Sequence, residues 1–312
     1  MNNFSSQSVE IEIEPCHNGT RQCYHTFSQI LDGINCLSII INILHLLVLN
    51  QIKELKTTKY FWILMNMNIS DVIYSISSIL FFNCGVRKII LKAPRLTGYW
   101  LSKLIVVGIG YGASLRVLVF LVSSIEKYIG VCHPYEYSTH FFINNIKSLS
   151  GLIYICGLLS SFAHIMIPEI KFCWTLLTIQ ISQKTLENNV VYASYGIQNC
   201  IMSFLISFIL IKIWKELQAM NQRILPKDKL VISATKYSIL SFVVYQLSFL
   251  FVVVVLICDA VGFLPSIAIP VQALAYSLLS MYGIINVLIF ISFHPKYIDH
   301  VKRIFRIAAH SH

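Results

Sequence analysis

The chain has 312 residues, of which 56% are hydrophobic and 12% are charged, and its formal net charge at pH 7 is +10. A soluble protein of this length could not hide so much apolar surface from water, so the composition excludes a soluble globular fold and indicates a lipid bilayer. The positive charge needs no nucleic-acid partner, because membrane lipid of the anionic inner leaflet and a cytoplasmic partner account for it.

The first 27 residues are polar and precede the first apolar run. They lack the basic-then-apolar pattern of a cleavable signal peptide, and they hold three glutamates against one arginine. An acidic flank favours export, so we expect residues 1–27 to be an extracellular N-terminus. Asn3 and Asn18 each begin an Asn-x-Ser/Thr pattern, which makes both candidate glycosylation sites on that side.

Seven apolar runs follow, each long enough to cross a hydrocarbon core of roughly 30 Å as a helix of about 20 residues. The apolar stretches do not alternate in polarity as the strands of a membrane β-barrel would. The sequence therefore predicts an all-α membrane protein, a seven-transmembrane helix bundle over residues 28–293. The expected spans are Ser28–Gln51, Tyr60–Cys84, Leu96–Cys132, Ile146–Pro168, Val190–Trp214, Leu230–Asp259 and Leu264–Phe293.

The distribution of lysine and arginine agrees with an external N-terminus, since most of them then lie on the inner side of a multi-pass plasma-membrane protein. Seven crossings place residues 294–312 in the cytoplasm. Pro295 breaks the last span, and a short amphipathic helix is predicted on the inner membrane surface, with a frayed basic tail as the alternative. The apolar face of that helix would consist of Ile298, Val301, Ile304, Phe305 and Ala308.

Polar residues inside the apolar spans are the informative ones, because each is costly at the bilayer centre unless it is paired or hydrated. Asp71 lies in the middle of the second expected span and Arg116 in the middle of the third. We expect a buried ion pair between them, with Asn42 and Asn286 completing its hydrogen bonds. In the alternative, Arg116 extends to the lipid headgroups or pairs elsewhere.

The sequence carries no signature of catalysis. It has no nucleophile with a local base, no glycine-rich phosphate loop, no HExxH and no CxxC pair. We expect neither an enzyme nor a bound cofactor or metal.

The inner end of the third expected span reads Glu126-Lys127-Tyr128, followed by Ile129, Cys132 and Pro134. This stretch resembles the acidic–Arg–Tyr triplet and its continuation in rhodopsin-like G-protein-coupled receptors. Asn42, Asp71 and Asn286 fall where that family keeps polar residues in spans one, two and seven. Within the family the chain looks most like the divergent fish and amphibian odorant-receptor-like group.

The resemblance implies a chemosensory receptor, acting in olfaction, that binds a small extracellular molecule and activates a heterotrimeric G protein. It places coupling and switching at Glu126, Lys127, Tyr128, Tyr245 and Phe290. Here the chain departs from the family, with Lys127 in place of an arginine and Phe290 in place of a tyrosine. Lysine lacks the planar fork of arginine, which puts coupling in question.

Such bundles bind ligands between the outer halves of helices three, five, six and seven. Ile109 stands where amine receptors carry an aspartate, so a biogenic amine held by an ion pair is disfavoured. The alternative for each candidate is ordinary packing between helices. On helical phase, the candidate ligand-binding residues are Ile109, Ala113, Ser248, Phe249, Val252, Gln272, Tyr276 and Ser280.

The resemblance also bears on sodium and on disulfides. Arg116 falls where the family usually has a small polar residue that helps Asp71 to bind sodium, so we expect no sodium effect of the ordinary kind. The family's cysteine at the outer end of helix three falls near Ser102, which leaves Cys84 as the nearest candidate partner of Cys173. Bridges from Cys173 to either N-terminal cysteine, and free thiols, remain open.

Two other functions fit parts of the pattern. An orphan receptor for a lipid or a peptide would share the same architecture. A seven-span transporter or channel would use Asp71 and Arg116 to line a permeation path, but the sequence shows no internal repeat with matched helix breaks.

Overall fold

A computed structural model describes residues 21–302, except 57, 84–85, 87–88, 90–93, 163–170, 173–178, 181–185, 223–228, 261–267 and 295–296. The two candidate glycosylation sites, Asn3 and Asn18, lie outside the described residues. So do Cys84 and Cys173, and so does most of the expected amphipathic helix after Lys302.

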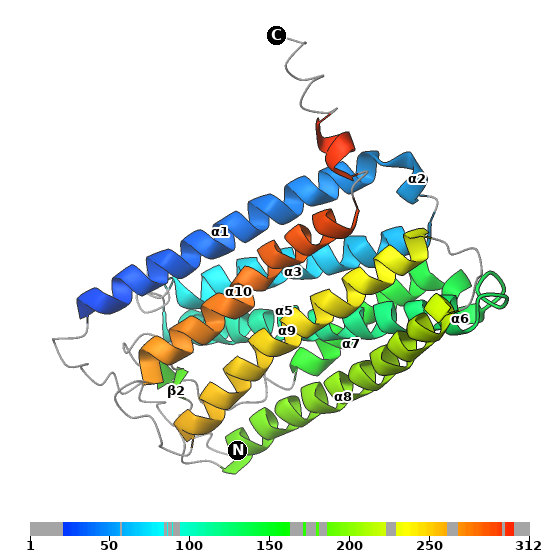
Figure 1. Ribbon diagram of the computed structural model, residues 1–312. Helices are drawn as coiled ribbons and strands as arrows, with labels where there is room; N and C mark the ends of the chain where they lie inside the picture. The colour runs from blue at the N-terminus through cyan, green and yellow to red at the C-terminus, as the bar shows by residue number, and fades with distance from the viewer. Residues whose placement is uncertain are drawn as a thin grey trace, which may run out of the picture.

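The described chain is a helical bundle in which seven helices have 17 or more residues (Figure 1). Their order in sequence is α1 (Arg21–Gln51), α3 (Tyr60–Phe82), α5 (Arg95–Cys132), α7 (Ile146–Phe162), α8 (Leu186–Gln222), α9 (Lys229–Ala260) and α10 (Ala268–Phe293). Two single-turn helices, α2 (Lys53–Lys56) and α6 (Phe141–Asn144), lie in connections at one end. A two-residue strand, β1 (Lys171–Phe172), pairs antiparallel with β2 (Ile179–Gln180).

Within the described residues, five helices are long and apolar enough to cross a membrane. They contain the segments Ser28–Gln51, Tyr60–Phe82, Lys103–Cys132, Ile232–Val254 and Tyr276–Phe293. The apolar segment of α7, Ile146–Ser161, is shorter. The second expected span ends two residues early, because Asn83 adopts an extended backbone and caps α3 through its N–H to the Ile79 carbonyl.

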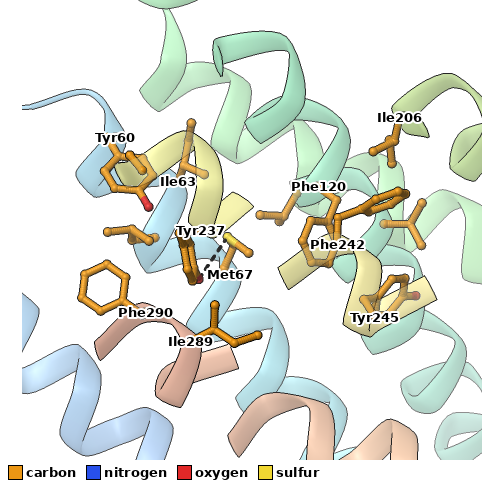
Figure 2. Close-up of a cluster of buried hydrophobic side chains, with 14 of the residues drawn as sticks. Tyr60, Ile63, Met67, Phe120, Ile206, Tyr237, Phe242, Tyr245, Ile289 and Phe290 are labelled. Atoms are coloured by element: carbon orange, nitrogen blue, oxygen red, sulfur yellow. Dashed lines mark hydrogen bonds between the residues drawn. The ribbon is translucent and has the colours of Figure 1, made fainter. Parts of the chain in front are cut away.

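The bundle is arranged for lipid, with large apolar side chains both inside and outside. On the outside, Phe204 of α8 is 73% exposed and Leu159 of α7 is 65% exposed. Inside, aromatic rings from α5, α9 and α10 meet around Phe120, whose ring centroid lies 5.2 Å from that of Tyr245 and 5.5 Å from that of Phe242 (Figure 2). Exposed apolar surface of this kind suits a hydrocarbon solvent.

Glycine allows two helix pairs to approach closely at the depth of Asp71. A Cβ on Gly112 of α5 would lie 2.7 Å from the Tyr74 Cα on α3. A Cβ on Gly283 of α10 would lie 2.6 Å from the Ser38 Oγ on α1. At Gly112 the neighbour is backbone, so α3 and α5 are held at a spacing that only glycine permits, whereas at Gly283 the Ser38 hydroxyl would have to turn away.

We predict that Gly112→Ala destabilises the fold, because the added methyl group must push α3 away from α5. Overpacking of this kind costs about 1–3 kcal/mol. The melting temperature of the purified protein in detergent measures the effect. Gly151→Ala on α7 is the matched control, since a Cβ there meets nothing within 4 Å. Equal melting temperatures for the two variants would contradict the close approach.

Candidate functional site

Asp71 and Arg116 form a buried ion pair between α3 and α5. The Arg116 Nε donates to Asp71 Oδ1 at 2.7 Å, and each side chain is 1% exposed. Each residue lies near the middle of a long apolar helix, where a single charge without a partner would be strongly disfavoured. The pair expected from the sequence is therefore present, and the alternative in which Arg116 extends to the lipid headgroups is wrong.

Beyond Nε, the Arg116 guanidinium contacts α10 and two aromatic rings, whereas its buried Nη2 has no hydrogen-bond partner among the described residues. Its Nη1 donates to the Leu279 carbonyl at 3.1 Å. Its Cζ lies 3.9 Å from the ring centroid of Tyr74 and 5.3 Å from that of Tyr282. A planar cation stacks well on such rings, so the guanidinium is fixed in orientation as well as neutralised.

The second oxygen of Asp71 connects the pair to α9 and α10. Asp71 Oδ2 accepts a hydrogen bond from the Asn286 Nδ2 at 3.2 Å. The amide oxygen of Asn286 in turn accepts from the Tyr237 hydroxyl at 2.8 Å and from Ser241 Oγ at 2.7 Å. One amide thus joins three helices at one depth, as the sequence predicted for Asn286 but without foreseeing Tyr237 and Ser241.

Asn42 on α1 is fully buried, but its amide is used differently from the expectation. Its Nδ2 donates to the Ser38 carbonyl at 2.8 Å and to the Gly283 carbonyl at 3.4 Å. The expected hydrogen bond to the ion pair is not the one it makes. The close approach of α10 at Gly283 brings the Gly283 carbonyl within hydrogen-bonding distance of the Asn42 amide. Asn42 therefore joins α1 to α10 beside the pair.

The space next to the pair is nearly closed. Met67, Ser70, Phe120 and Tyr282 line a small gap there together with Asp71 and Arg116, and it has no room for a water molecule. The guanidinium fills the volume that a hydrated cation beside Asp71 would need. Among the described residues, no three His, Cys, Asp or Glu side chains gather to hold a metal ion.

A second charged group lies near the C-terminal end of α5. The Lys127 Nζ lies 2.7 Å from Glu126 Oε2 and 3.7 Å from the ring centroid of Tyr60 on α3. Tyr137, in the turn after α5, donates from its hydroxyl to Glu126 Oε1 at 2.6 Å. Burial raises the pKa of Tyr137 well above its usual value, and the adjacent Glu126 carboxylate raises it further, so this hydroxyl keeps its proton.

The three aromatic residues expected to act as switches occupy separate positions. Tyr245 is buried between Phe120 and Tyr282, at ring-centroid distances of 5.2 and 5.3 Å. Phe290 packs near the C-terminal end of α10, where its ring lies 5.4 Å from that of Tyr237 (Figure 2). Tyr128 is partly buried, with its ring 5.5 Å from that of His133. Their roles in switching stay predictions.

The residues expected to bind a ligand fall into two packed groups. Ile109 of α5 and Tyr276 of α10 pack against Phe82 at the C-terminal end of α3. Phe249 stacks on Tyr245, with ring centroids 6.0 Å apart. The other candidates that the structure describes add little polarity: Ala113 is partly buried, Val252 is buried, Ser248 Oγ donates to the Val244 carbonyl, and Ser280 is fully buried. The Gln272 side chain lies outside the described residues.

Comparison of the sequence with protein-family models and with curated proteins finds no match to either. Function therefore has to be inferred from the residues and their geometry.

We predict that removing either charge of the pair is more damaging than exchanging the two. Asp71→Ala or Arg116→Ala leaves a buried charge without its partner, which costs about 3–5 kcal/mol. Asp71→Arg combined with Arg116→Asp restores neutrality and should recover part of the loss. Surface expression and melting temperature measure the cycle. Strictly additive effects would show that the two side chains do not depend on each other.

Proposed function

We propose that the chain is a seven-helix receptor of the rhodopsin-like kind, in which α7 and α8 also cross the bilayer and the N-terminus lies outside. The observation that carries this proposal is the buried network of Asp71, Arg116 and Asn286, which joins α3, α5, α9 and α10 at one depth. It occupies the positions where the resemblance predicts the polar core of such a receptor.

The remaining two helices suit a membrane as well. At about 1.5 Å per residue, the 17 residues of α7 extend about 25 Å, close to the thickness of a hydrocarbon core. The 37 residues of α8 are more than sufficient. Both helices run alongside α5 (Figure 1) and expose large apolar side chains such as Ile155 and Phe204. Aqueous solvent would not favour those surfaces, whereas lipid would.

The ligand that best fits the outer half of the bundle is small and uncharged. Ile109, Tyr276 and Phe249 offer apolar and aromatic surface, and a neutral ion pair lies below them. A charged ligand would find no opposite charge among these candidates. This chemistry supports a chemosensory receptor for small organic molecules; a lipid or a peptide is the competing ligand class within the same architecture.

A transporter receives less support from the same geometry. A permeation path along Asp71 and Arg116 needs water or an ion at that depth, and the gap beside the pair has no room for either. Both polar ends of the pair are instead used to bind neighbouring helices, as a switching bundle requires.

Signalling would leave the bundle at its inner end, where Glu126 and Lys127 lie between α5 and α3. Lys127 is neutralised by Glu126 and covered by the Tyr60 ring, so in the resting arrangement it is not free to contact a partner protein. Movement of α9 and α10 away from α5 would expose this lysine to a heterotrimeric G protein. A lysine provides one point charge there instead of a planar fork, so we expect weak coupling.

The experiment that tests the proposal expresses the full chain in cells that carry reporters for several G-protein classes. A panel of volatile organic molecules, lipids and peptides is applied, and Tyr245→Ala serves as a variant with a truncated aromatic core. A dose-dependent signal from an organic molecule that Lys127→Arg increases would support the proposal. A signal from lipids or peptides alone would favour the competing ligand class. A tag on the N-terminus has to be detected outside the cell, and its detection in the cytoplasm would refute the topology.

We predict that sodium does not stabilise the protein beyond other monovalent salts, because the guanidinium of Arg116 occupies the cation position beside Asp71. Melting temperatures in sodium chloride and in choline chloride should agree. Arg116→Ser frees the carboxylate and should make the melting temperature rise with sodium. A marked sodium effect on the unaltered protein would show that the arginine does not take the place of the ion.

A further inference from the structure

The end of the bundle that the proposed topology places in the cytoplasm contains a histidine surrounded by aromatic rings. His294 follows α10, and its ring stacks on that of Phe290 at a centroid distance of 4.0 Å and an interplanar angle of 12°. Tyr60 of α3 stacks at 6.2 Å and Tyr237 of α9 meets the ring edge-on at 6.1 Å. Figure 2 shows that Tyr60, Tyr237 and Phe290 lie near one another. We call these four residues the inner aromatic box.

The hydrogen bonds of His294 define its neutral tautomer. Its Nδ1 lies 3.0 Å from the Phe290 carbonyl oxygen, which can only accept, so Nδ1 carries the proton. Its Nε2 then carries no proton and can only accept a hydrogen bond. That atom is buried and has no hydrogen-bond partner within the described part of the chain. The one position where a proton can add is therefore enclosed and unsatisfied.

The charged and titratable groups around the box oppose a second positive charge. From α5, Lys127 lies over the Tyr60 ring, and its charge is already matched by Glu126. From α3 and α9 come the hydroxyls of Tyr60 and Tyr237. From α1 comes His45, whose Nδ1 lies 2.7 Å from the hydroxyl of Tyr297, in the segment after α10. Glu126 is the one acidic group among these neighbours.

We propose that His294 is a sensor of cytoplasmic protons and that its protonation opens the inner end of the bundle. Addition of a proton at Nε2 places an imidazolium among three rings and close to a lysine, with one carboxylate for two cations. The bundle relieves this repulsion between the two cations by moving the end of α10 and the segment around Tyr297 away from α3. Opening gives Nε2 access to water and separates the cations.

The direction of the effect follows from the surroundings of the ring. Burial lowers the pKa of His294 below the ordinary histidine value of about 6.5 in the closed arrangement; the Phe290 carbonyl raises it, and the charge of Lys127 lowers it further. When the ring is exposed in the open arrangement its pKa returns toward the ordinary value. The closed arrangement is thus fully favoured above about pH 6.5 and loses its advantage as the pH falls.

The test uses the full chain in lipid nanodiscs and needs no ligand and no G protein, so failure of the receptor assay leaves it unaffected. A trifluoromethylphenylalanine replaces Ile298, beside Tyr297, and its fluorine NMR spectrum is recorded from pH 7.5 to 5.5. We expect two signals whose ratio changes by up to about tenfold per pH unit, the limit for one linked proton.

His294→Phe keeps a stacking ring that cannot bind a proton, and it should hold the closed signal at every pH. His133→Phe, at an exposed position, is the matched control and should keep the original slope. Lys127→Met removes the neighbouring cation, so the closed arrangement tolerates the proton better and the transition should move to lower pH or shrink, which tests the proposal even if His294→Phe does not fold. The proposal would be overturned if the signal ratio of His294→Phe still changed with pH, or if that change were lost in His45→Phe, in which His294 is intact.

Discussion

A carboxylate and a guanidinium that are each 1% exposed can stay charged in a membrane only if they stay together. That constraint fixes α3 against α5 at Asp71 and Arg116. Nη1 of Arg116 and the second oxygen of Asp71 then bind Leu279 and Asn286 of α10. Because these groups have no competing water, the positions of three helices follow from the need to satisfy one pair of charges.

The sequence predicted this pair because an isolated charge in a long apolar run is easy to see and has to find an opposite charge. It predicted the helical bundle for a similar reason, since apolar runs of span length leave few alternatives. Asn42 was placed in the right region but with the wrong partner. The direction of its amide depends on how closely α10 approaches α1 at Gly283, and this distance is set by packing that no single run reveals.

The end of the bundle where α5 and α10 terminate was the least predictable part. Tyr60, Tyr137 and His294 are common residue types in unremarkable contexts. Tyr60 contacts Lys127 and His294, and Tyr137 bonds Glu126, only because α3 begins at the end of the bundle where α5 and α10 terminate. The sequence drew attention to Glu126 and Lys127 through their resemblance to a receptor triplet. It gave no sign that one tyrosine would cover the lysine and that another would hold the glutamate.

The two sites are connected along one face of α10. Asn286, Phe290 and His294 are spaced four residues apart, so they lie one above another on a helix. Tyr237 of α9 contacts all three: its hydroxyl bonds Asn286, and its ring packs against those of Phe290 and His294. Ser233 adds a hydrogen bond to the Phe293 carbonyl, so α9 and α10 are bonded at both depths. A shift at Asp71 would therefore reach His294 by moving α9 and α10 as one unit, and a charge gained at His294 would act back on the Asp71 network by the same route.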